Sequence, residues 1–322
     1  GAHEAPPAIM SIFLGDQLTE VFEAFRAGRA EDAANGKKGR ALNVGVETLP
    51  PLPTDPGDRN RTSPVAFTGN RFEFRAVGSS QSAAGSITAL NAMMADSLGY
   101  AADWLEKKIS EGHSLNAAVE SFIGHIIEEH SAVIFNGDGY SDIWHKEAER
   151  RGLPNLRNTP EALPELTRPD VIELYESQGI LKRTELKARQ DIYLEQYCKT
   201  VRTEAKLTMR MARTIIFPAG MRYQGELAAT ALRMKELGHD YRTTTLDAVT
   251  AGLHGLQDAT ARLEQCLTDM DAAGEGLEAA QRYCQEVLPL MAEVRRHGDM
   301  LETRVADDLW ALPNFQEILF GK

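Results

Sequence analysis

Cysteine is scarce in this sequence, and long apolar runs are absent from it. The three cysteines are scattered through segments of helical pattern and show no metal-ligand spacing; they are Cys198, Cys266 and Cys284. We interpret them as reduced thiols in the core of a cytoplasmic protein. No apolar run approaches the length of a membrane-spanning helix, and no signal-peptide pattern is seen, so we expect neither a membrane protein nor a secreted one.

Basic residues are also in short supply. The sequence has 35 lysines and arginines against 47 acidic residues, which gives a formal net charge of −12. A field of this sign repels phosphate backbones and anionic lipids, so we expect no nucleic acid and no membrane surface among the partners. With 322 residues, 43% of them hydrophobic, the chain is otherwise typical of a globular protein and long enough for two domains.

Helical periodicity dominates the chain from Ala83 onward. Proline is expected to interrupt this helical pattern at three places. Residues 154–169 should form a loop, Pro218 should end the helix that Thr184 caps, and Pro289 should kink the last long helix. The helices that we predict are Ala8–Arg26, Ser86–Lys108, Leu115–Val133, Ser141–Arg151, Thr184–Ile216, Met221–Leu237, Leu246–Met270 and Leu277–Trp310.

The sharpest periodicity lies near the C-terminus. Apolar residues there step by three and then by four, with one polar exception, at Leu246, Val249, Leu253, Leu256, Thr260, Leu263, Leu267 and Met270. This is an a/d seam, which is typical of an antiparallel bundle or a coiled coil. We therefore predict a mixed α+β domain at residues 1–178 and a helical bundle domain at residues 179–322.

Between Asp58 and Ser82 lies the stretch that is least expected of a plain scaffold. Phe72-Glu73-Phe74-Arg75 alternates strictly, so on a strand the two rings point to one face and the two charges to the other. A carboxylate and a guanidinium on one face, backed by aromatic packing, suit a cleft that handles a divalent metal and a phosphoryl group. Arg59 and Arg61 repeat the two-residue spacing upstream. The alternative is a solvated strand face with a surface ion pair.

Five separated segments, in the right order, resemble glutamine synthetases of type III, the long bacterial class. The segments are Gly1–Pro7, Asn60–Gly69, Asn70–Ser82, Asn136–Leu156 and Leu309–Phe320. The resemblance implies an α+β, predominantly helical fold, in which the C-terminal portion of the catalytic fold is followed by a helical bundle. It also implies a cytoplasmic ligase that joins ammonia to L-glutamate through γ-glutamyl phosphate, uses ATP and Mg²⁺ or Mn²⁺, and assembles as a large double-ring homo-oligomer.

The resemblance assigns roles to four residues. Glu4 resembles the flap glutamate that closes over the substrate and helps to deprotonate ammonium, and Arg61 resembles an arginine that contacts nucleotide phosphate and glutamate. Glu73 resembles a ligand of one of the two divalent metals. Arg75 resembles the arginine near the γ-carboxylate and the transferring phosphoryl group, whose negative charge such a residue compensates. Ala66 stands where the shorter bacterial enzymes carry a second phosphate-binding arginine.

Only the later part of such an enzyme is covered by the resemblance. The chain opens at Gly1, without a methionine and inside a motif, and the family's earlier metal-binding glutamates and histidine are not in it. Glu73 alone would leave a divalent ion mostly hydrated, so we expect the chain by itself to be inactive. The alternative is a non-catalytic helical scaffold or oligomerisation protein derived from the family.

Two other patterns look like metal sites at first sight. His125 and His130 are five residues apart, about 140° around a helix, and therefore diverge; His125 and Glu129 can share a face, but not at a metalloprotease spacing. We interpret them as ordinary helix polarity. The segment 136–140 is not a calcium loop, because Ser141 stands at the position of the invariant glycine, and we expect a helix end and a turn there.

Overall fold

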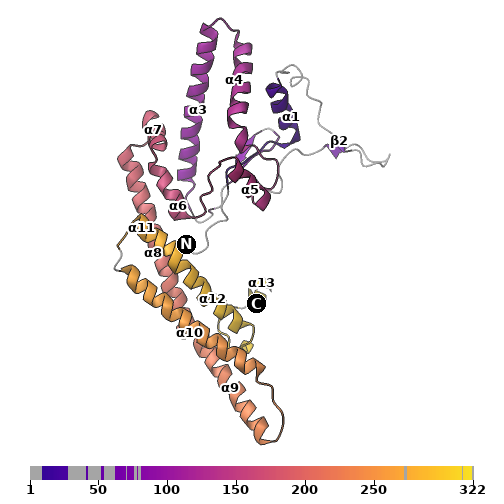
Figure 1. Cartoon of the computed structure of the whole chain (residues 1–322), viewed down its shortest axis with the longest axis vertical. Helices are drawn as coiled ribbons and strands as arrows, with labels where there is room; N and C mark the ends of the chain where they lie inside the picture. The colour runs from indigo at the N-terminus through magenta and orange to yellow at the C-terminus, as the bar shows by residue number, and fades with distance from the viewer. Residues whose placement is uncertain are drawn as a thin grey trace. The chain divides into compact units, whose positions relative to one another are not determined.

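A computed structural model of the chain describes residues 9–27, 41–42, 52–53, 62–69, 71–75, 78, 81–271, 274–313 and 315–320 (Figure 1). The fold is α+β and predominantly helical, as predicted. The described residues divide into two compact units. The sheet unit runs from Ile9 to Arg157 and includes Thr167–Arg183, and the bundle unit comprises Asn158–Leu166 and the residues from Thr184 onward. Across these described ranges, no helix combines the length and the apolar character that a membrane span requires.

The sheet unit contains a small three-stranded sheet. Strand β1 (Ile12–Phe13) pairs in parallel with β4 (Val65–Phe67), and β4 pairs antiparallel with β5 (Phe72–Phe74), so that β5 is an edge strand. A separate antiparallel pair joins β2 (Ala41–Leu42) and β3 (Leu52–Pro53). The sheet therefore places β5, which carries two of the predicted site residues, at its margin.

The first helix is shorter than the sequence predicted. Residues Ile12 and Phe13 belong to β1, and α1 (Gly15–Arg26) begins only after them. Gly15 has a φ of 72°, a left-handed conformation that favours glycine and separates the strand from the helix. The Asn136 side chain, whose Oδ1 accepts hydrogen bonds from the N–H groups of Leu14 (2.9 Å) and Gly15 (3.2 Å), caps the start of α1.

Two long helices of the sheet unit form a hairpin, seen at the top of Figure 1. They are α3 (Ala84–Ser110) and α4 (Leu115–His130), close to the predicted bounds, and η1 (Ser131–Val133) follows α4. Aromatic contacts hold the hairpin together. The rings of Trp104 and His125 stack with centroids 4.4 Å apart, and the Tyr100 hydroxyl lies 2.9 Å from Nε2 of the same histidine.

Helix α5 (Asp142–Arg150) is anchored by the tryptophan that it carries. Trp144 is fully buried, in a cluster with Ile9 and Ala148, and its indole N–H donates to the Ile9 carbonyl oxygen at 3.3 Å. Nη1 of Arg151, just after the helix, donates to two backbone carbonyl oxygens of the segment that follows α4, each at 2.9 Å. These contacts fasten α5 to the rest of the sheet unit.

The segment 154–169 is not a plain loop, which corrects the prediction. It contains α6 (Thr159–Ala162) and η2 (Leu163–Thr167), and α7 (Pro169–Ser177), which the sequence did not predict, follows. Two of the prolines that suggested a loop stand in the first turn of α6 and α7, where a missing N–H group costs no helical hydrogen bond. Asn158 caps α6 by accepting a hydrogen bond from the Glu161 N–H at 3.0 Å.

The bundle unit is built around α10 (Thr244–Asp271), which packs against α9 (Phe217–Glu236) and α12 (Leu288–Glu302). The a/d seam predicted on α10 is confirmed as the core. Its buried members are Val249, Leu253, Leu256, Thr260, Leu263, Leu267 and Met270. Thr260, the polar exception, is satisfied because its hydroxyl donates to the Leu256 carbonyl oxygen at 2.6 Å.

Both prolines expected to interrupt a bundle helix, Pro218 by ending it and Pro289 by kinking it, follow a π-helical turn. The chain runs directly from α8 (Arg183–Met211) through η3 (Ala212–Ile216) into α9, with Pro218 as the second residue of α9. Likewise α11 (Leu277–Arg282) leads through η4 (Tyr283–Val287) into α12, which has Pro289 as its second residue. The prediction that Pro218 ends a helix was therefore wrong.

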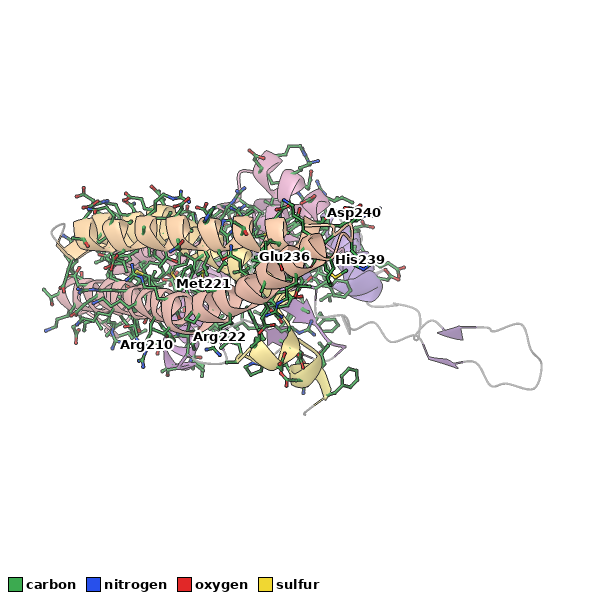
Figure 2. All side chains as sticks on the ribbon, turned by 90° about the horizontal axis from the view of Figure 1, so that it is seen from below. Arg210, Met221, Arg222, Glu236, His239 and Asp240 are labelled. Carbon is green, nitrogen blue, oxygen red and sulfur yellow. The ribbon has the colours of Figure 1, made fainter. Side chains whose placement is uncertain are left out.

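The physical reason lies in hydrogen bonding. Proline lacks an N–H group and its ring clashes with the carbonyl group four residues earlier, whereas a π turn pairs groups five residues apart. At η3 the Phe217 N–H accordingly bonds to the Ala212 carbonyl oxygen. The helix continues on both sides of this turn. Figure 2 labels one residue on each side of η3, Arg210 before it and Arg222 after it, and both lie along the lower edge of the ribbon.

Glycines shape the turns of the bundle unit. Gly238, after α9, has a φ of 77°, and Gly274 and Gly276, before α11, have φ of 84° and 108°. Beyond α12, the described chain contains η5 (Asp307–Leu309) and α13 (Phe315–Phe320).

Candidate functional site

The β4–β5 hairpin positions Glu73 and Arg75. Glu73 lies opposite Ala66 in the ladder, and the N–H of Arg75 donates to the Pro64 carbonyl oxygen at 2.7 Å. Directly paired residues point to the same face of a sheet, so Glu73 shares its face with Ala66, which is fully buried. Glu73 and Arg75 therefore project from the covered face of the sheet.

The alternation predicted for this strand is correct, but the aromatic backing is not. Phe72 and Phe74 point away from the charges, and they are 52% and 40% exposed. Phe72 contacts Phe67 of the neighbouring strand with ring centroids 5.3 Å apart. The apolar face of the hairpin is thus the open one in the described part of the chain.

Glu73 is held between two arginines. Arg71 donates to Oε1 of Glu73 from Nε (3.2 Å) and from Nη2 (2.9 Å), and Nη2 of Arg75 donates to Oε2 at 3.3 Å. The hydrogen bonds from Arg71, followed by those from Arg75, hold the pKa of Glu73 below its ordinary value of 4.5. Glu73 is therefore a carboxylate at neutral pH.

Arg71 is the member of this group that the sequence reasoning missed. It stands two residues before Glu73, as Arg75 stands two residues after it, so the period of a strand places all three on one face. Arg71 is largely exposed, with 71% of its side chain accessible, against 20% for Arg75. One carboxylate flanked by two guanidinium groups leaves a net positive strand face, which suits a carboxylate or phosphoryl ligand.

A complete metal site is not found among the described residues. No group of three or more histidine, cysteine, aspartate or glutamate side chains comes together there in a way that could hold a metal ion. Glu73 offers a single carboxylate, and both of its oxygens already accept hydrogen bonds. The donors in this part of the chain therefore do not fit a divalent metal on their own. Glu4 and Arg61, the other two predicted site residues, lie outside the described residues.

The two other patterns that look like metal sites, around His125 and at residues 136–140, are contacts within a helix and within a turn. Nε2 of His125 lies 3.1 Å from a carboxylate oxygen of Glu129, one turn along α4, and that oxygen is 3.9 Å from Nε2 of His130. The segment 136–140 is a turn, as predicted, in which the Tyr140 N–H donates to the Asp138 carboxylate at 2.9 Å.

Comparison with known proteins supports the resemblance seen in the sequence. Residues 118–235 match the family model described as the glutamine synthetase C-terminal domain. The chain is 34% identical to a glutamine synthetase of Bacteroides fragilis (strain YCH46), over 100% of this chain and 45% of that relative. It is 37% identical to a type-3 glutamine synthetase of Dictyostelium discoideum, over 99% of this chain and 44% of the relative.

A glutamine synthetase of Butyrivibrio fibrisolvens is 32% identical over 100% of this chain and 45% of its own length. The chain thus spans less than half the length of the curated relatives that it matches. These matches confirm the predicted resemblance to glutamine synthetases, including its type III character.

Proposed function

We propose that the chain supplies one side of the active site of a type III glutamine synthetase, which ligates ammonia to L-glutamate through γ-glutamyl phosphate with ATP. The observation that carries the proposal is the group of Arg71, Glu73 and Arg75 on one strand face. Phosphoryl transfer is catalysed mainly by positioning and by compensation of spreading negative charge. A strand that presents guanidinium groups in fixed orientation is suited to that task.

Each residue has a distinct role in this proposal. Arg75, mostly buried and oriented by Glu73, binds the γ-carboxylate and the transferring phosphoryl group. Glu73 is one ligand of Mg²⁺ or Mn²⁺, and the other ligands of the metal ion come from outside the described residues. Glu4 closes over the substrate and Arg61 binds nucleotide phosphate. A cytoplasmic location and a large double-ring homo-oligomer belong to the same proposal.

The test uses a chimera in which the part of the Bacteroides fragilis relative without a counterpart here is joined to this chain, in the order of the relative. We expect ATP- and metal-dependent formation of γ-glutamyl hydroxamate. Arg75→Lys should lower turnover by about 10²-fold, because an ammonium group cannot make the paired contacts of a guanidinium. Arg168→Lys is the matched control, since Arg168 makes a two-pronged pair with Asp170 (2.6 and 2.7 Å) elsewhere. Equal turnover of both variants would refute the assignment.

A non-catalytic scaffold derived from the family is the second candidate. It is favoured by the absence of a three-donor metal group among the described residues and by the continuous buried seam of α10. This candidate predicts a folded chimera with no hydroxamate formation at any concentration of ATP or metal.

A further inference from the structure

Helix α3, all of which the structure describes, is apolar and yet poorly covered. It buries one residue, Ala92. Its exposed large apolar residues are Ile87 (55%), Met93 (48%), Met94 (62%), Leu98 (64%), Tyr100 (43%) and Ile109 (46%). A helix with apolar side chains on most of its circumference is normally buried, and a contiguous exposed apolar patch marks an interaction site.

Four of these residues lie along one side of the helix and are named here the α3 stripe: Ile87, Met94, Leu98 and Ile109. At 100° and 1.5 Å per residue they fall within an arc of about 60° over a length of about 33 Å. Trp104, which stacks on α4, lies about 110° away around the helix, so α4 does not cover the stripe. The helix also carries no charge before Asp96, its first charged residue.

A second apolar surface of the same unit is open. Phe72 and Phe74 occupy the exposed face of the edge strand β5. In the bundle unit, by contrast, the main apolar seam, that of α10, packs against other helices of the chain. Uncovered apolar faces on both a helix and a sheet indicate that the sheet unit is completed by further polypeptide.

The relatives match 99–100% of this chain but only 44–45% of their own length, so more than half of each relative has no counterpart here. We infer, on the basis of the proposed function, that the α3 stripe is the docking surface for this remaining part of a glutamine synthetase. A second copy of this chain is the competing occupant, and the concentration dependence of thiol reactivity distinguishes the two.

Thiol accessibility tests the inference without reference to activity. Met94→Cys and Leu98→Cys place a thiol on the α3 stripe, and Leu232→Cys, at a position on α9 that is 59% exposed, is the control. In the isolated chain all three should react with a maleimide at similar rates, after subtraction of the parent chain's own cysteines. In the chimera the two stripe thiols should react at least about 10-fold more slowly, since only opened molecules expose them, while the control is unchanged.

Two results would overturn the inference. One is equal reactivity of the stripe thiols in the chimera and in the isolated chain. The other is slow, concentration-dependent reaction in the isolated chain, which would mean that a second copy covers the stripe. Circular dichroism checks that each variant folds, and Ile87→Cys and Ile109→Cys give the same measurement if another variant does not. A chimera with protected thiols but no ligase activity would refute the proposed function and leave the docking surface standing.

Discussion

Helices α10 and α12 come so close at Gly252 that a methyl group does not fit. A Cβ atom there would lie 2.7 Å from Cε of Met300 and 2.9 Å from Cδ2 of Leu301. The methionine can move its end, but the Leu301 side chain is fully buried in the core. Overpacking of this kind costs about 1–3 kcal/mol, whereas alanine returns about 1 kcal/mol of helix propensity. We therefore expect Gly252→Ala to destabilise the bundle by up to about 2 kcal/mol.

Gly225→Ala is the matched control, because Gly225 lies inside α9 and a Cβ atom there meets nothing within 4 Å. This control keeps the gain in helix propensity and should raise the free energy of unfolding by about 0.5–1 kcal/mol. Urea unfolding followed by circular dichroism measures both variants, and the propensity term cancels between them. The two should differ by about 1–3 kcal/mol, with Gly252→Ala the less stable. Equal stabilisation by both changes would show that α10 and α12 are not packed as described.

Three further predictions concern the isolated chain. These 322 residues alone should form no γ-glutamyl hydroxamate from glutamate, hydroxylamine, ATP and metal, and detectable product would refute this. Residues 179–322 should fold as a helical bundle on their own, and a largely unordered circular dichroism spectrum would contradict this. The bundle should be more stable when Asn158–Leu166 is included, because Nε2 of Gln190 donates to the Leu163 carbonyl oxygen at 3.1 Å. Hydrogen bonds from two neighbouring arginines lower the pKa of Glu147 from 4.5 to about 2, so its stabilising effect is complete above pH 4.5 and is lost as the pH falls toward 2. The melting-temperature deficit of Glu147→Gln should therefore be largest near neutral pH and vanish near pH 2, and a pH-independent deficit would argue against it.

The periodicity of apolar residues alone predicts the long helices. The a/d seam of α10 and the bounds of α3 and α4 follow from apolar spacing, because these helices are ordered by their own packing faces. The prolines were harder to interpret, since their effect depends on context. Pro218 is tolerated after a π turn, and a proline in the first turn of a helix costs no hydrogen bond, which is not visible from composition.

The candidate site was predictable in part for a similar reason. Strict alternation placed Glu73 and Arg75 on one face, and the same rule applied two residues earlier would have found Arg71. Whether the opposite face is covered could not be read from the strand. The exposure of Phe72 and Phe74 depends on segments distant in sequence, so local alternation cannot decide it.

The most direct test of the account is a metal titration of the chimera carrying Glu73→Gln. Glutamine keeps the shape and one oxygen of the side chain but removes the charge. If Glu73 is a metal ligand, this substitution should raise the half-saturating Mg²⁺ or Mn²⁺ concentration and lower turnover by at least about 10²-fold. The melting temperature should change little. Glu111→Gln is the control, because Glu111 is also a partly accessible carboxylate (41% of its side chain, against 34% for Glu73) whose pKa is lowered by a basic neighbour, Lys108 at 3.0 Å. The account predicts that only Glu73→Gln shifts the metal dependence, and an unshifted dependence would contradict it.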